Sequence, residues 1–329
     1  MFQTTLVGNQ PKISNDPKRV NLRNVRNRCD KGKATAADVE DALRATIAWT
    51  VSDQEAAEID RVTDGRIRWD DPVTPFAAAH DGFSPGGLIR YFDNNVYYRR
   101  PAITERLAFR ESAVAGDFRR LRESTSRPVM AAVCGPFSLA RFCTNEHYKN
   151  DADLYADCAV LVNRELQALA EAGAEWVQLD EPFLGFCPDT VGEAVGAIAA
   201  AVQGVNVKTF VYTYFGSLAP VIERLWDLPV AAIGADCATV PGNFDCLLRG
   251  PETMGRGFGL IDARSTRLEP PDFLIAHLER IAEAGAESWP CCWITPSAGL
   301  EFLPYQNAQA KMQRPALTTR QVAGQAPVG

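Results

Sequence analysis

The sequence is poor in several features that mark common classes of protein. Its 329 residues include only three histidines, and 34 Lys and Arg stand against 41 Asp and Glu, for a net charge of -7. A chain without a basic excess has no electrostatic reason to bind nucleic acid or an anionic membrane. No apolar run reaches the roughly 18 residues of a membrane span, and no charged segment followed by an apolar one opens the chain. We therefore expect a cytoplasmic protein whose partner is a small-molecule substrate, with no nucleic-acid or membrane partner; assembly into a homo-oligomer stays open.

The nine cysteines show neither a disulfide nor a metal-binding pattern. No Cys-x2-Cys pair occurs, and an odd number in a chain without an export signal favours buried, reduced thiols. The histidines, His80, His147 and His277, have no spacing that joins them to a cysteine pair. The sequence therefore predicts no metal site; a site with unusual ligands is the less favoured alternative.

The chain is rich in short apolar runs that alternate with helical segments. Eight runs bounded by Gly, Pro or Asp are typical of strands: 4–8, 59–65, 129–135, 175–182, 207–213, 230–237, 257–263 and 291–296. Segments of helical period lie between most of them, as in 34–58, 153–173 and 270–285. Eight strand–helix units with strands apolar on both faces predict an α/β fold, a parallel (β/α)8 TIM barrel. We expect one barrel over 1–312 and a polar C-terminal tail over 313–329 that is either loosely ordered or packed along a neighbour.

Residues 66–128 interrupt this alternation. Only the part near Pro101 to Glu123 has a helical pattern, and the rest is rich in Arg, aromatic residues and Gly. Loops of this length in compact domains are usually lids or binding segments, so we expect a lid-like loop. Its arginines either clamp a carboxylate or phosphate or are solvated surface charge. They are Arg66, Arg68, Arg90, Arg99 and Arg100.

Polar side chains follow several of the expected strands. In chain order they are Asn9, Asp64, Asp180, Glu181, Asp236, Asp262 and Ser297. In a parallel barrel these positions meet at one mouth, where active sites are built. Each one taken alone could equally cap the helix that follows it. Their number around one rim favours a functional cleft.

Six short motifs occur in order along the chain: TTLVGNQPK (4–12), VTDGRIRWDD (62–71), CGPFSLARF (134–142), VQLDEP (177–182), GLIDARS (259–265) and TPSAGL (295–300). Together they resemble the C-terminal catalytic barrel of the cobalamin-independent methionine synthase family in its single-barrel form. Each motif is weak alone, but the ordered set runs from about Thr4 to Met312. The resemblance implies a TIM barrel of the methionine synthase / uroporphyrinogen decarboxylase-like type, and methyl transfer from a folate to a thiol.

The chain departs from this family at the positions that carry its chemistry. The zinc ligands that the resemblance implies are replaced by Phe210, Tyr212, Pro241 and Ala298, so no zinc is expected. Arg66 stands where the family has a Glu that contacts the substrate amine, and Arg264 stands where it has a proton-donating His. Phe142 replaces the Trp that stacks on the pterin, while Asp180, Glu181, Asp236 and Asp262 match.

These observations predict a set of site residues. We expect Asp180, Tyr212, Asp262 and Arg264 to be catalytic, with Asp180 as a base and Tyr212 as a hydrogen-bond donor or acid. Substrate-binding residues are expected at Gly8, Asn9, Asp64, Arg66, Gly135, Phe142, Glu181, Tyr214, Asp236 and Ser297.

The function expected is zinc-independent methyl or one-carbon transfer on a small anionic substrate other than homocysteine, with a tetrahydrofolate derivative as donor or acceptor. A metal-free lyase or decarboxylase in the same cleft and a non-catalytic binder of folate or a small acid remain as alternatives.

Overall fold

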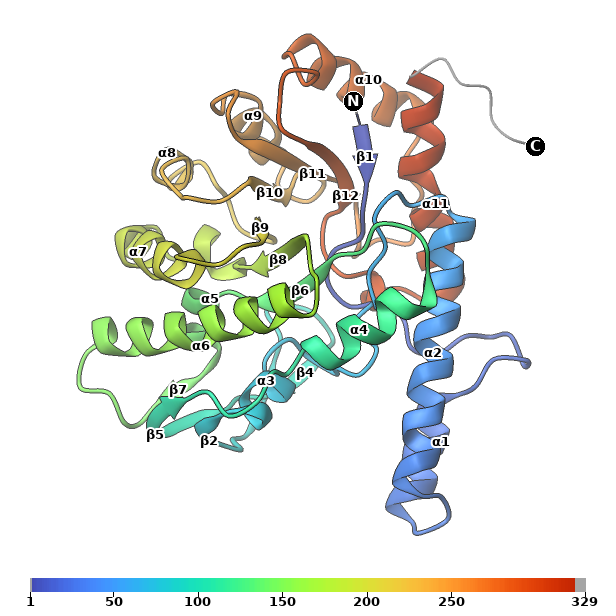
Figure 1. Ribbon diagram of the computed structural model, residues 1–329. Helices are drawn as coiled ribbons and strands as arrows, with labels where there is room; N and C mark the ends of the chain where they lie inside the picture. Colours follow the sequence, from blue (N-terminus) through green and yellow to red (C-terminus); the bar gives the residue numbers. More distant parts are fainter. Residues whose placement is uncertain (1, 323–329) are drawn as a thin grey trace.

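Seven parallel strands curl around a common axis and form the core of the molecule (Figure 1). The computed structural model describes residues 2–322. In sheet order the strands are β1 (Phe2–Thr4), β12 (Cys292–Pro296), β11 (Gly255–Ile261), β10 (Ala232–Asp236), β9 (Lys208–Thr213), β8 (Trp176–Asp180) and β6 (Ala131–Cys134). Every neighbouring pair is parallel. This arrangement confirms the α/β barrel-type fold predicted from the apolar runs.

The second expected strand, 59–65, is reduced to two bridging residues. Arg61 bridges Thr5 beside β1, and Val62 bridges Val129 beside β6. The Asp60 carboxylate accepts the backbone N–H of Thr4 at 2.7 Å, a bond that a ladder carbonyl would otherwise make. The side chain of Gln54 likewise takes both backbone groups of Thr63, at 2.9 and 2.7 Å. Side chains therefore replace strand hydrogen bonds where the two edges of the sheet meet.

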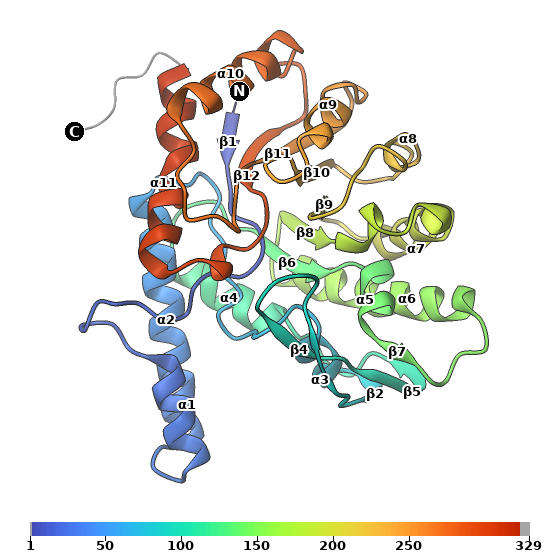
Figure 2. The ribbon, with the colours of Figure 1, turned by 180° about the vertical axis from the view of Figure 1, so that it is seen from behind.

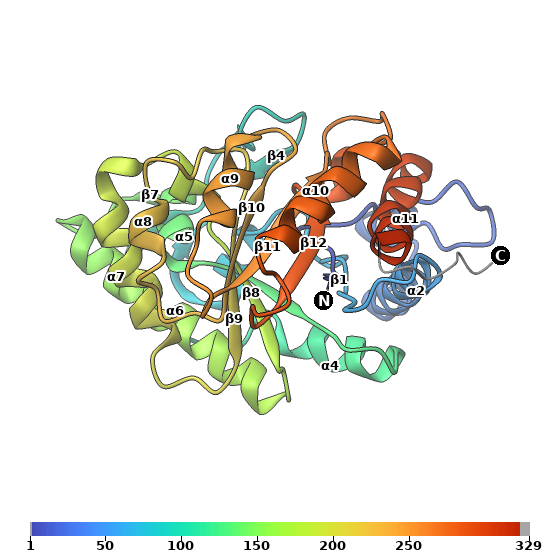
Figure 3. The same cartoon turned by 90° about the horizontal axis from the view of Figure 1, so that it is seen from above.

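Helices surround the strands, as the view from above shows (Figure 3). Their bounds are α1 (Leu22–Asp30), α2 (Ala36–Ala56), α5 (Pro136–Phe142), α6 (Asp151–Glu171), α7 (Val191–Val202), α8 (Ile222–Leu225), α9 (Gly242–Leu248), α10 (Pro271–Glu283) and α11 (Tyr305–Val322). Three single turns, η1 (Pro182–Gly185), η2 (Pro188–Thr190) and η3 (Leu300–Phe302), follow β8 and β12. Capping fixes where helices begin: Thr35 and Asp38 form a capping box on α2. No helix among the described residues is long and apolar enough to cross a membrane.

Residues 66–128, called the lid segment below, fold into small elements of their own beside the barrel (Figure 2). They contain α3 (Thr74–Ala79), β2 (Asp81–Ser84), β3 (Leu88–Arg90), β4 (Tyr97–Arg99), β5 (Ala102–Ala108) and α4 (Ala115–Ser124). β3 and β4 form a hairpin, and β5 lies between β2 and β7 (Thr144–Asn145).

The helix expected near Pro101 to Glu123 is wrong in its first half, because residues 102–108 form strand β5. The buried residues Ile103 and Leu107 are four apart, a spacing that a helix shares. Residues four apart also lie on the same face of a strand, so this spacing does not distinguish the two kinds of element.

Of the two alternatives left open for the end of the chain, loose ordering is wrong for residues 313–322. Helix α11 continues to Val322 and so includes these residues. Its Lys311 is fully buried and donates to Glu269 at 2.6 Å. The rest of the expected tail, 323–329, lies outside the described residues. All nine cysteines are free thiols, and six of them are buried.

Candidate functional site

A buried ion pair joins the second and fourth expected strand ends. Arg66 Nη2 lies 2.5 Å from Asp180 Oδ2, with the side chains 5% and 1% exposed. Gln178 donates to the other carboxylate oxygen at 2.5 Å. Burial alone would lower the pKa of the Arg66 guanidinium, but the adjacent carboxylate outweighs burial and raises it. Arg66 therefore stays charged, and Asp180 is its counter-ion.

A small pocket opens beside this pair, and we call it the Arg66 pocket. Its volume is about 10 Å³, which is room for little more than a single water molecule. Four predicted residues line it: Gly8, Asn9, Arg66 and Tyr214. The other lining residues are Pro72, Tyr91, Ala298, Gly299, Glu301 and Phe302.

Two glycines bring the backbone close at this pocket. Gly8 has φ +65, and a Cβ on it would lie 2.7 Å from the Cα of Gly299. The loops after β1 and β12 therefore touch backbone to backbone, which only glycine permits. Next to them, burial raises the pKa of the Glu301 carboxyl to about 7. That value would let Glu301 exchange a proton near neutral pH.

The lid segment contributes Tyr91 to the lining of the pocket, and residues 91–93 are called the lid tip below. The Tyr91 and Tyr214 hydroxyls are 2.7 Å apart. The Tyr91 ring stacks on Phe142, with centroids 5.5 Å apart and planes 14° apart. The Asp93 carboxylate pairs with Arg264 Nη2 at 2.8 Å. The predicted residues Phe142, Tyr214 and Arg264 are thus joined by a segment of the chain itself.

Glu181 and Gly135 support the loop after β6. The Glu181 carboxylate accepts the backbone N–H groups of Phe137 at 3.0 Å and Ser138 at 2.7 Å, at the start of α5. A Cβ on Gly135 would lie 2.2 Å from Glu181 Oε1, so the carboxylate fits only against glycine. Burial raises the pKa of Glu181 to about 7. These two residues lie behind the Arg66 pocket and do not line it.

The positions where the family resemblance implies zinc ligands do not fit a zinc ion. Phe210 and Ala298 offer no donor atom, and Pro241 has only its ring. Tyr212 is fully buried, and its hydroxyl donates to the Pro296 carbonyl at 2.8 Å. Among the residues that the structure describes, no three Cys, His, Asp or Glu side chains gather where they could hold a metal ion.

Aromatic rings occupy this part of the barrel. The Phe210 ring packs 4.5 Å from that of Trp293 and 5.5 Å from that of Tyr212, measured between centroids. A Cβ on Gly257 would lie 2.4 Å from Phe210, so the strand beside it has room only for glycine. Tyr212 lines neither the Arg66 pocket nor the pocket around Asp262, and burial raises its pKa well above the ordinary value.

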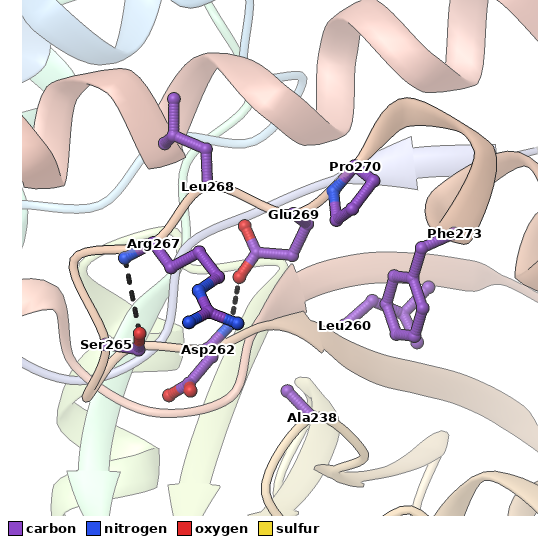
Figure 4. Close-up of a pocket in the computed structure, with 9 residues that line it drawn as sticks. All are labelled: Ala238, Leu260, Asp262, Ser265, Arg267, Leu268, Glu269, Pro270 and Phe273. Atoms are coloured by element: carbon purple, nitrogen blue, oxygen red, sulfur yellow. Dashed lines mark hydrogen bonds between the residues drawn. The ribbon is translucent and has the colours of Figure 1, made fainter.

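A second pocket, the Asp262 pocket, lies at the ends of β10 and β11 (Figure 4). Its volume is about 420 Å³. The Asp262 N–H donates to Glu269 at 2.9 Å, and its own carboxylate accepts the N–H of Arg264 at 2.8 Å. Other lining residues are Ala238, Leu260, Ser265, Arg267, Leu268, Pro270 and Phe273. Asp262 therefore belongs to an open rim, apart from Arg66.

Three further predicted residues hold turns. Asp236 accepts the N–H of Thr239 at 2.8 Å, Ser297 Oγ accepts that of Ala263 at 3.0 Å, and Asp64 accepts that of Arg66 at 3.1 Å. Burial raises the pKa of Asp64 to about 6. These contacts hold turns and a loop; none of the three side chains caps the helix that follows it, which was the alternative that the sequence left open.

Of the five lid arginines, Arg66 alone lines the Arg66 pocket. Arg68 pairs with Glu40 and Asp117 at 2.7 and 2.9 Å. Arg90 donates to the Asn94 carbonyl at 2.6 Å and Arg100 to the Cys143 carbonyl at 3.1 Å, while Arg99 is exposed. The sequence could not separate these roles, because all five stand in the same kind of context.

Tyr91 and Glu301 are pocket residues that the sequence analysis did not identify. Glu301 follows directly after the TPSAGL motif, so a wider view of that motif would have included it. Tyr91 lies in the aromatic stretch RYFDNNVYYRR, where composition indicates a binding segment but cannot single out one ring.

Comparisons with known proteins support this architecture. The family model described as the catalytic domain of cobalamin-independent synthase matches residues 2–321. A methionine synthase of Thermococcus kodakarensis is 28% identical over 315 residues, covering 95% of this chain and 90% of that protein. One of Sulfurisphaera tokodaii is also 28% identical, with the same shares covered.

Solved structures show the same fold. A B12-independent methionine synthase from Shewanella sp. W3-18-1 superposes with a TM-score of 0.81 at 20% identity, over 98% of this chain and 97% of that one. A methyltransferase from Methanosarcina mazei has a TM-score of 0.60 at 12% identity, over 95% and 94%. The expected enzyme class, a methyltransferase-like transferase, is confirmed. This chain belongs to the cobalamin-independent methionine synthase family, whose catalytic barrel it spans.

Proposed function

We propose that the protein transfers a methyl or other one-carbon group without zinc, to or from a small anionic substrate other than homocysteine. The observation that carries this proposal is the filling of the expected zinc position by Phe210 and Tyr212, which pack inside the barrel with no free donor atom. A thiol bound there would have no metal to keep it deprotonated.

Arg66 supports the choice of an anionic substrate. It lines the pocket, it stays charged, and its Nε has no hydrogen-bond partner among the described residues. A carboxylate placed there would gain a charge-assisted hydrogen bond. The α-ammonium group of homocysteine cannot accept a hydrogen bond from this Nε–H, so it would gain no contact at that atom.

Two carboxyl groups belong to this region: Asp180, which contacts Arg66, and Glu301, which lines the pocket. Asp180 orients the guanidinium through their 2.5 Å contact, so we assign it a positioning role rather than that of a free base. Glu301 lines the pocket and has a pKa near neutrality, so it is suited to carry a proton. Asp262 and Arg264 would act only on a part of the ligand that reaches the rim.

A tetrahydrofolate derivative remains the proposed partner in the transfer. Phe142 offers a flat apolar ring, the kind of surface on which a pterin stacks. Tyr91 covers this ring in the closed arrangement. The proposal therefore requires the lid tip to move before a folate enters.

A matched pair of thiols tests the proposed substrate class. L-homocysteine and 4-mercaptobutyrate differ only in the α-ammonium group, and each is offered with (6S)-5-methyltetrahydrofolate to protein purified without a tag after expression with zinc. We expect far less than one zinc per chain and methylation of 4-mercaptobutyrate in preference to homocysteine. Stoichiometric zinc together with preference for homocysteine would overturn the proposal. Folate binding without turnover of either thiol would favour a non-catalytic binder.

A further inference from the structure

The lid tip presents three different chemical groups to three different walls of the barrel mouth. Residue 91 offers a phenol ring, residue 92 a phenyl ring and residue 93 a carboxylate. The hairpin of β3 and β4 carries all three, and the turn is held by the Tyr91 N–H, which donates to the Val96 carbonyl at 2.8 Å. The tip therefore reaches the mouth as one preformed unit.

The first group, the Tyr91 ring, covers the face that a planar ligand needs. It lies nearly parallel to Phe142 and is 4% exposed. The Phe183 ring packs edge-on against Phe142, with centroids 4.9 Å apart. The proposed stacking surface is thus occupied by the protein's own aromatic side chain.

The second group, Phe92, sits among four other phenylalanines. Its ring centroid is 5.2 Å from that of Phe183, 5.3 Å from Phe186, 5.5 Å from Phe215 and 6.0 Å from Phe142. Its backbone has φ +50, in the left-handed region that a residue with a side chain rarely adopts. The unfavourable backbone conformation thus occurs at the residue whose ring packs into the cluster.

The third group, the Asp93 carboxylate, pairs with Arg264 at the rim. Their side chains are 71% and 30% exposed. The guanidinium also lies 5.0 Å from the centroid of the Phe215 ring, which fixes it beside the aromatic cluster. An exposed pair of this kind is weak and readily exchanged for another anion.

We propose that the lid tip is an internal substitute for the ligand. Its planar ring, second ring and carboxylate occupy the positions where the same three groups of a ligand would bind. The ligand class is thus a flat aromatic ring joined through a second ring to a carboxylate. On entry it displaces Tyr91 from Phe142, and its carboxylate replaces Asp93 on Arg264. This inference rests on the proposed function for the choice of a reduced folate as probe.

An internal substitute lowers the apparent affinity for the ligand, because only the fraction of molecules with the tip displaced can bind. Removing the ring should therefore strengthen binding. If Tyr91 were instead a wall of the ligand site, removing it would weaken binding. The two roles predict effects of opposite sign.

The experiment is a binding titration of Tyr91→Ala by calorimetry with two probes. One is (6S)-5-methyltetrahydrofolate; the other is 4-hydroxyphenylacetate, a small flat ring with a carboxylate that fits the space the tyrosine leaves. We expect Tyr91→Ala to bind both about tenfold more tightly than the unaltered protein. The control, Tyr97→Ala, removes a tyrosine of the same hairpin that is 61% exposed, and should change neither affinity.

Asp93→Asn is a second test of the proposal, and it does not depend on how well Tyr91→Ala folds, because it alters only an exposed side chain. Freeing Arg264 should strengthen binding of both probes by about threefold, and Arg264→Gln in the same chain should abolish that gain. Asp245→Asn is the matched control, since Asp245 pairs with Arg280 at 2.7 Å far along the chain and is 54% exposed.

The outcomes separate this inference from the proposed function. Tighter binding of 4-hydroxyphenylacetate by Tyr91→Ala, with no folate bound by any form, would support the internal substitute and overturn the folate proposal. Folate binding by the unaltered protein that does not tighten in Tyr91→Ala and Asp93→Asn would leave the proposed function standing and overturn the substitute. A loss of affinity for both probes in Tyr91→Ala would make Tyr91 part of the ligand site.

Discussion

The two sides of the barrel mouth carry similar residues in opposite physical settings. On one side Arg66 and Asp180 form a pair that is 5% and 1% exposed, beside a pocket of about 10 Å³. On the other, Arg264 and Asp93 form a pair that is 30% and 71% exposed, near a pocket of about 420 Å³. Solvent weakens the second pair but cannot reach the first. Position at a strand end therefore does not decide what a charge does; its burial does.

The largest effect should come from breaking the buried pair. Arg66→Gln leaves the Asp180 carboxylate buried without its counter-ion, and we expect a loss of about 3–5 kcal/mol in the free energy of unfolding. Urea denaturation measures it. Arg264→Gln, on the open side, is the control and should cost less than about 1 kcal/mol. Equal effects of the two substitutions would contradict the contrast between the sides.

The pH dependence of stability tests the buried carboxylates on the side of the barrel mouth that holds Arg66 and Asp180, called the closed side below. The raised pKa values of Glu181, about 7, and Asp64, about 6, mean that the folded protein holds protons that the unfolded chain has released. Stability is therefore fully present below the unfolded pKa values and falls as pH rises through the folded ones, between about pH 4 and 7.

For Glu181 alone the loss should be on the order of 3 kcal/mol, and Glu181→Gln should remove that part of the slope. Denaturation midpoints measured across this pH range give the slope. A curve for Glu181→Gln that runs parallel to that of the unaltered protein would show that the carboxyl does not titrate there.

A smaller effect is expected where the closed side is narrowest. Gly8→Ala places a Cβ 2.7 Å from Gly299 on a backbone with φ +65, and should destabilise by about 1–3 kcal/mol. Gly196→Ala in α7 is the matched control, because a Cβ there meets nothing within 4 Å; it should stabilise by about 0.5–1 kcal/mol. Thermal unfolding of both variants compares them. A neutral Gly8→Ala would mean that the two loops can separate at little cost.

The smallest effect should come from Asp93→Asn, which removes one charge of the exposed pair on the open side. The free energy of unfolding should change by less than about 1 kcal/mol, and less still in high salt. Urea denaturation at two salt concentrations measures both. A loss of unfolding free energy as large as that of Arg66→Gln would show that the Asp93–Arg264 pair behaves like a buried pair.

Most of the fold could be predicted because its strands are apolar on both faces. Seven of the eight expected runs overlap strands of the central sheet, although the run 4–8 shares only Thr4 with β1. A run such as 230–237 forms a strand because it has no polar face to expose. The run 59–65 has only two apolar side chains, Ile59 and Val62, and the side chains of Asp60 and Gln54 bond backbone groups there. A pattern of apolar residues cannot show which groups a distant side chain will bond.

The site could be predicted only in part, because sequence order gives position at the mouth but not burial. Gly8, Asn9, Arg66 and Tyr214 were expected at the site and line the closed pocket. Tyr212 has the same alternating position as Tyr214, two residues away, but its hydroxyl bonds Pro296 within the barrel. Asp262 was expected beside Asp180 and lies on the open rim instead, because the loop after β11 holds it against Glu269.

The pairing of β1 with β12 determines when the sheet can close during synthesis. Residues 2–4 take their strand partners from residues 292–294, so β1 has no partner on that side until those residues have been made. Until then its edge is open, and on its other side only Thr5 and Arg61 form a bridge. Synthesis at roughly 5–20 residues per second leaves that edge unpaired for tens of seconds. The closed barrel mouth thus forms only after residues 292–296 have been made, and until then the strand edge of β1 is open to pairing with another chain.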